Sequence, residues 1–160
     1  MPRKFYRKSY RSSPRDKYSI EHTTVSVLTA ATATANLYQQ TTNIVPASPT
    51  QGMRKVKHVT VSLTSDLPQS GVLSSIYWAL VYVPEGYSVN PMNGNPGASF
   101  YEPNQFVMAA GCNDPEAGPI RVRSPISRNL NSGDSIWLVV GTNQPQTSVR
   151  GLVNYAITLQ

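Results

Sequence analysis

The sequence predicts an all-β domain, a sandwich or a barrel, preceded by a short basic arm. Three observations point to this fold class. Apolar residues recur at every second position in several short segments, thirteen prolines and ten glycines punctuate the chain, and no window of eleven or more residues shows a sustained helical period with a cap. Eight or so short strands joined by polar turns are typical of β-sandwiches and β-barrels.

Residues 1–17 are predicted to be a disordered arm, and residues 18–160 a single domain. The arm contains seven basic residues and one acid, Asp16, so it alone accounts for the net charge of +6. Residues 18–160 contain seven bases and seven acids. The arm has too little apolar surface to offset the entropy lost on ordering.

The composition of the arm indicates binding to single-stranded nucleic acid. Seven cations that each displace a counterion predict a log–log salt slope of about −5 on a single strand, and aromatic rings between them can stack on unpaired bases. The candidate nucleic-acid-binding residues of the arm are Arg3, Lys4, Phe5, Tyr6, Arg7, Lys8, Tyr10, Arg11, Arg15 and Lys17. The alternative is a tail that only solubilises the protein or directs nuclear import, since the basic pairs also resemble an import signal.

The predicted strands follow in chain order. Residues 20–29 and, more weakly, 33–40 come first. Residues 56–64 (VKHVTVSLT) place Val59, Val61 and Leu63 on one face and polar residues on the other, which is the period of a half-buried strand. Residues 76–83 and 136–140 are apolar on both faces, so they are predicted to be central strands or strands with a second covered face. Residues 105–110, 119–124 and the alternating segment 153–160 complete the set.

Turns and one long connection separate these strands. Residues 65–71 and 131–134 are rich in turn formers, and Asp134 in the second of them suits a turn that its side chain stabilises. Residues 84–103 are dominated by Pro, Gly and Asn, and a loop of this length usually has a function at the surface.

Several classes of protein are excluded. No apolar segment with a cleavage site follows the arm, as a secretory signal requires, and the longest apolar run, residues 76–83, is far shorter than the ~20 residues that span a bilayer. Cys112 is the only cysteine, so no internal disulfide can form, and the default reading is a buried free thiol.

Residues for catalysis or metal binding are also scarce. His22 and His58 lie on different predicted strands without zinc-ligand spacing and are read as strand-surface residues. Asp114 and Glu116 are read as part of a turn rather than a metal site. No catalytic or nucleotide-binding motif occurs, so we expect neither an enzyme nor a cofactor.

The domain carries little charge. About a tenth of residues 18–160 are charged, against roughly 25% in soluble domains, and net charge near zero promotes association. We therefore expect self-assembly; the alternative is a monomer with a polar, uncharged surface.

Three segments resemble the capsid proteins of circovirus-like viruses, which are small circular single-stranded DNA viruses that encode a replication initiator. They are WALVYVPEG at residues 78–86, YEPNQ at 101–105 and SRNLNSGD at 127–134, in this order and behind a basic arm. The resemblance implies an eight-stranded jelly roll of two four-stranded antiparallel sheets, with sixty copies forming an icosahedral shell around the genome. It also implies an inward-pointing arm, a location in the virion and, during assembly, the host nucleus, and an unknown host receptor.

A comparison of the arm charges with the phosphates of a genome adds further candidate nucleic-acid-binding residues. Sixty arms at +6 would supply about 360 positive charges, whereas each nucleotide carries one negative charge. Bases of the domain could help, and the candidates are Arg54, Lys55, Lys57, Arg121 and Arg123. Each could equally be solvated surface or part of an intersubunit salt bridge.

Two alternative functions stay open. The chain is close in size to the jelly-roll coat proteins of satellite-type RNA viruses, and a monomeric β-barrel that binds single-stranded nucleic acid would need bases and aromatic rings on its surface. A metal-dependent jelly-roll enzyme ranks lower, because His22 and His58 are too few to build its site.

Overall fold

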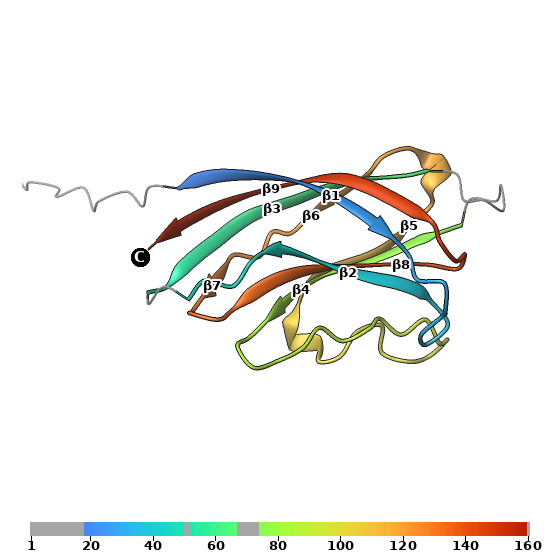
Figure 1. Ribbon diagram of the computed structural model, residues 1–160, viewed down its shortest axis with the longest axis horizontal. Coiled ribbons are helices and arrows are strands. Elements are labelled where there is room, and N and C mark those ends of the chain that lie inside the picture. The colour runs from blue at the N-terminus through green and yellow to red at the C-terminus, as the bar shows by residue number, and fades with distance from the viewer. Residues whose placement is uncertain (1–17, 50–51, 67–73, 160) are drawn as a thin grey trace, which may run out of the picture.

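The protein is a sandwich of two antiparallel sheets (Figure 1). The computed structural model describes residues 18–49, 52–66 and 74–159. One sheet has the order β1-β9-β3-β6, with β7 pairing beside β3, and the other has the order β2-β8-β4-β5. The strands are β1 (Ser19–Leu28), β2 (Tyr38–Val45), β3 (Arg54–Ser65), β4 (Ile76–Val83), β5 (Val107–Asn113), β6 (Ile120–Arg123), β7 (Arg128–Leu130), β8 (Ser135–Thr142) and β9 (Ser148–Leu159).

This strand order is that of a jelly roll. If the three-residue β7 is set aside, the eight remaining strands, counted in chain order, pair as 1-8-3-6 in one sheet and 2-7-4-5 in the other. Both orders arise when a long hairpin folds back into two Greek keys. The predicted fold class is thereby confirmed, with β7 as a fifth strand in the first sheet.

The main core lies between the sheets and follows the alternation of the sequence. On β3, Val59, Val61 and Leu63 are completely buried, while Thr60 and Ser62 between them are partly exposed. On β8, Ile136, Leu138 and Val140 meet them from the opposite sheet. Burial of one face of each sheet supplies most of the hydrophobic stabilisation.

A second, smaller core lies on the outer face of the sheet β2-β8-β4-β5. Residues 84–106 cross this face below the sheet in Figure 1, and Met92 and Tyr101 from this loop pack on Ala79, Val81 and Val139. The covered face explains why β4 and β8 are apolar on both sides. The long loop is therefore part of the core as well as of the surface.

One predicted strand is misplaced. The sequence predicts extended chain over residues 33–40, but Thr34 and Leu37 pair across a tight turn in which Ala35 and Asn36 have φ angles of 48° and 65°. Only β2, which begins at Tyr38 and continues to Val45, is extended. Two consecutive residues in the left-handed region reverse the chain direction.

The burial predicted for Cys112 is also wrong. The thiol is exposed, because β5 is the last strand of its sheet and its residues from Ala109 to Asn113 are at most partly covered. The small side chains of this strand gave no periodic signal from which its edge position could be inferred.

Candidate nucleic-acid interface

The outer face of the sheet β1-β9-β3-β6 carries most of the basic residues of the domain. On β6, Ile120 and Val122 point into the core, so Arg121 and Arg123 are exposed on the other side. On β3, Val56 is buried, and its neighbours Lys55 and Lys57 therefore lie on the outer side. We call the four residues Lys55, Lys57, Arg121 and Arg123 the basic face.

The strand register places neutral polar side chains beside these cations. Arg123 lies opposite Thr60, and Arg121 lies opposite Ser62. Further across the sheet, Asn154 of β9 lies opposite Thr60. Hydroxyl and amide groups can donate hydrogen bonds to phosphate oxygens, and they add no negative charge that would oppose a polyanion.

Tyr18, the first residue that the structure describes, contacts this same face. Tyr18 immediately precedes β1, and the Lys57 Nζ atom lies 3.6 Å from the centroid of its ring. A cation over an aromatic face is a favourable contact, and it connects the first described residue to the basic face across β9. Residues 1–17 lie outside the described residues, so the arm's ten candidate residues stay a prediction.

Acidic groups are largely kept off the basic face. Asp66 pairs with Arg150 at 3.1 Å, where both side chains are at least half exposed, and this is the one ion pair among the residues described. The other acids lie away from these cations. Glu85 and Glu102 are in the long loop, and Asp114 and Glu116 are in the connection between β5 and β6. Asp134 is in the turn before β8, and Glu21 of β1 is opposite Tyr155 on the side of the strand that faces the core. The domain has no net charge, but its basic and acidic residues lie largely in different regions.

Arg54 takes a different position from the other basic candidates. It lies two positions before buried Val56, so both residues are on the core side of β3. Its guanidinium donates a hydrogen bond to the Asp134 backbone carbonyl at 3.2 Å. This bond anchors the turn before β8, so Arg54 is not included in the basic face.

The two histidines lie on strands, as predicted. His22 of β1 hydrogen-bonds through Nδ1 to the Asn154 side chain, and His58 is exposed at a β-bulge of β3 where its φ angle is 56°. In the described part of the chain, no three His, Cys, Asp or Glu side chains are grouped so that they could hold a metal ion. Asp114 accepts a hydrogen bond from the Glu116 backbone N–H at 3.0 Å, which confirms that this pair forms a turn.

The alternation in the sequence placed Thr60, Ser62 and Asn154 on the polar side of their strands. It did not indicate that they lie beside Arg121 and Arg123, because the topology determines which strands are neighbours. The contact between Tyr18 and Lys57 depends on that neighbourhood too. No signal in the sequence indicated it.

Comparisons with known proteins give little further information. No model of a known protein family matches the sequence, and no curated protein matches it. Among solved structures, the chain is similar to one from the full particle of Israeli acute paralysis virus heated to 63 degrees, with a TM-score of 0.38 and 11% identity over 100% of this chain and 85% of that chain. A TM-score this low establishes neither a shared fold nor a shared function. Within the residues described, no helix has the length and apolar character needed to cross a membrane.

Proposed function

We propose that this protein is a viral coat protein whose copies associate into a closed shell and bind single-stranded nucleic acid on the inside. The observation that carries the proposal is the basic face. Four cations, which have no acidic partner among the residues described, lie on one side of a jelly roll, and Tyr18, the residue that follows the arm in the sequence, contacts one of them. Arm and domain together would present a continuous cationic surface to one polyanion.

Self-association has its own support in the first sheet. β1 is an edge strand of ten residues, so one side of its backbone has no partner among the strands described. It exposes Ile20 and Leu28 at 66% and 59%, and Leu152 on neighbouring β9 is 42% exposed. Exposed apolar side chains on an unpaired edge favour contact with another chain. We assign the free edge of β1 to contacts between copies, and the basic face to nucleic acid.

The finer identity of the virus rests on the sequence resemblance. The three segments shared with circovirus-like capsid proteins support a circular single-stranded DNA genome, a shell of sixty copies, and a life cycle in which the protein occupies the virion and, during assembly, the host nucleus. The partners would then be other copies of this chain, the genome and a host receptor. A satellite-type RNA virus is the alternative within the same function.

The rival function is a monomeric module that binds single-stranded nucleic acid. The basic face supports this candidate, because it supplies the cations that such a module needs on its body. Modules of this kind also stack bases on aromatic side chains of the binding sheet. Tyr18 is the one aromatic residue that the described part of the chain offers beside the basic face, which favours backbone contacts over base stacking.

Salt-dependent binding of a single-stranded oligonucleotide tests the role of the basic face. The triple variant K57A/R121A/R123A of the full chain should shallow the log–log salt slope by about 2, since each phosphate contact on a single strand contributes about 0.7. R150A is the matched control, because Arg150 lies on the same face but is paired with Asp66. An unchanged slope in the triple variant would contradict the proposed interface.

A further inference from the structure

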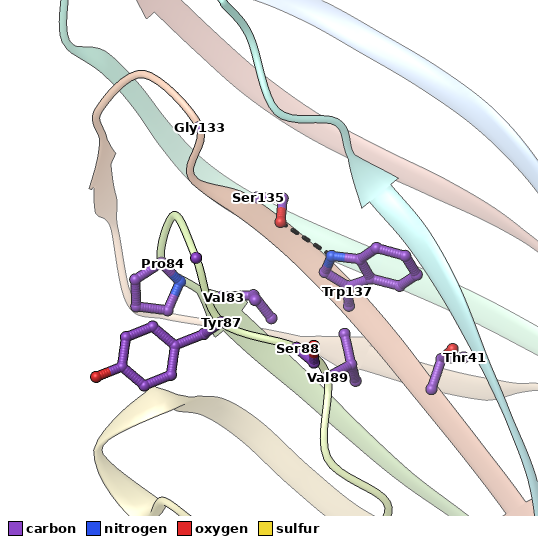
Figure 2. A pocket seen from close by; sticks show the side chains of 10 residues that line it. Thr41, Val83, Pro84, Tyr87, Ser88, Val89, Gly133, Ser135 and Trp137 are labelled. Carbon is purple, nitrogen blue, oxygen red and sulfur yellow. Dashed lines mark hydrogen bonds between the residues drawn. The ribbon is translucent and has the colours of Figure 1, made fainter.

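A pocket opens on the other side of the molecule, beside the outer face of the sheet β2-β8-β4-β5 (Figure 2). It lies between the start of β8, the middle of β2 and the loop that follows β4, and its volume is about 390 Å³. This volume is near the lower end of the range of roughly 300–1,000 Å³ found for ligand pockets. The pocket therefore suits one small ring better than an extended chain.

The walls of the pocket combine aromatic rings with hydroxyl groups. Trp137 and Tyr87 supply the rings, and Thr41, Ser88 and Ser135 supply the hydroxyls. In Figure 2 the indole of Trp137 stands between Ser135 and Thr41, with its Nε1 turned toward Ser135. Of the residues described, no charged side chain lines the pocket, so this lining offers no partner for an ionised ligand.

The hydroxyls retain unused hydrogen-bonding capacity. Ser135 is 7% exposed and accepts a hydrogen bond from the Trp137 indole N–H at 2.9 Å. A serine hydroxyl can accept two hydrogen bonds and donate one, and no acceptor for the Ser135 proton occurs among the residues described. The hydroxyls of Thr41 and Ser88 likewise make no hydrogen bond within the described part of the chain.

The rim of the pocket is braced by packing. Tyr87 is 65% exposed, and its ring meets Phe106 edge to face at 5.6 Å. Phe106 meets Tyr82 of β4 in the same way at 6.0 Å. This stack holds an exposed ring at the pocket without burying it. Exposed aromatic rings that are held in place lose little entropy on binding.

We propose that this pocket binds a neutral saccharide unit. The C–H faces of a sugar ring pack on aromatic rings, whose π faces carry partial negative charge. Its hydroxyls can hydrogen-bond to Thr41 and Ser88, which make no hydrogen bond in the described part of the chain, and can accept the Ser135 proton, while Ser135 keeps its bond from Trp137. A purely apolar ligand would leave the Ser135 proton without an acceptor. The inference does not depend on the proposed coat function; in a coat protein, this site would make neutral host glycans the receptor chemistry.

Saturation-transfer NMR on the full-length protein tests the proposal. The probes are methyl glycosides of glucose, galactose and mannose, N-acetylglucosamine, and N-acetylneuraminic acid as the charged comparison. At least one neutral sugar should receive saturation with a dissociation constant of about 1 mM, as expected for a ligand of about a dozen heavy atoms. N-acetylneuraminic acid should bind at least tenfold more weakly.

Two surface substitutions locate the binding. T41V keeps the shape of the side chain and removes its hydroxyl, and Y87A removes an exposed ring; each should weaken binding about 3- to 10-fold. The matched controls are S26A on the opposite sheet and I126A, which change an exposed hydroxyl and an exposed apolar residue away from the pocket. The proposal is overturned if no neutral sugar binds, if the acidic sugar binds as tightly, or if T41V and Y87A leave the binding unchanged.

Discussion

Asp134 is the residue through which three parts of the chain are joined. It is 3% exposed, and its carboxylate accepts hydrogen bonds from the Tyr82 hydroxyl at 2.8 Å, the Glu85 backbone N–H at 3.1 Å and the Asn131 backbone N–H at 2.8 Å. The turn role was predictable from the sequence Asn-Ser-Gly-Asp, and the bond to Asn131 confirms it. The bonds to β4 and to the start of the long loop were not predictable, because they join residues about fifty positions apart.

Removal of this carboxylate should destabilise the protein strongly. Asp134→Ala leaves the Tyr82 hydroxyl and two backbone donors without their acceptor, and we expect the free energy of unfolding to fall by about 2–4 kcal/mol. Urea denaturation measures the loss. Asp114→Ala, which removes a single bond in an exposed turn, should cost less than about 1 kcal/mol, and equal losses for the two variants would contradict the role given to Asp134.

Tyr82 should make stability depend on alkaline pH. Burial, the hydrogen bond to Asp134 and the charge of that carboxylate raise the pKa of Tyr82 from 10.0 to about 12. Because the pKa is higher in the folded state, this contribution to stability is complete below pH 10 and is lost as the pH rises toward 12. The melting temperature, measured from pH 8 to 12, should fall less steeply in Tyr82→Phe than in the unmodified protein.

Tyr82→Phe will not abolish the alkaline dependence, because burial also raises the pKa values of Tyr101 and Tyr155. Tyr87→Phe is the control, because it also removes a tyrosine hydroxyl, but from an exposed residue. In Figure 2 this hydroxyl points away from the pocket. Identical slopes for Tyr82→Phe and the unmodified protein would show that the bond to Asp134 does not act on the titration of Tyr82.

At the scale of elements, the alternation of apolar and polar residues predicted most strands, but it predicted their packing only in part. The two-residue period identified most of β3 and β9. Buried Val56 and Val59 are three positions apart, and this odd spacing marks the bulge at His58, where the register between β3 and β9 shifts. Because β4 and β8 are apolar on both faces, the sequence predicted that another segment covers their outer face. It did not indicate that residues 84–103 are this segment, because their packing on the sheet is visible only in the structure.

The close approach of β3 and β9 depends on a residue without a side chain. A Cβ atom added to Gly151 would lie 2.2 Å from the Ser62 backbone oxygen, so Gly151→Ala must push the two strands apart. We expect a loss of about 1–3 kcal/mol in the free energy of unfolding, measured by urea denaturation. Leu152→Ala on the same strand, at a partly exposed position, should cost less than about 1 kcal/mol, and a Gly151→Ala variant as stable as that control would contradict the packing.

At the scale of the whole molecule, the basic residues are divided between residues 1–17 and the basic face of the domain, and we propose that both bind nucleic acid. Composition alone revealed the basic arm and a domain with no net charge. It could not reveal that Lys55, Lys57, Arg121 and Arg123 share one face, because that depends on which strands are neighbours. Nor could it reveal the pocket at Trp137, whose walls come from three separate segments.

The arm and the domain should be separable in function. Replacing Arg3, Lys4, Arg7 and Lys8 by Gln in the full chain removes four charges without shortening it. Since we assign the contacts between copies to the domain, the variant should sediment as the same assembly and contain less nucleic acid. A variant that remains monomeric would show that the arm itself drives association.

We propose that many copies of this chain form a closed shell that holds nucleic acid. Negative-stain electron microscopy of the purified full-length protein, together with its absorbance at 260 and 280 nm, distinguishes such a shell from a monomer. We expect uniform closed particles with a high share of absorbance at 260 nm, as packaged nucleic acid gives. A single species of monomer size at every salt concentration would contradict the shell and favour the monomeric binding module.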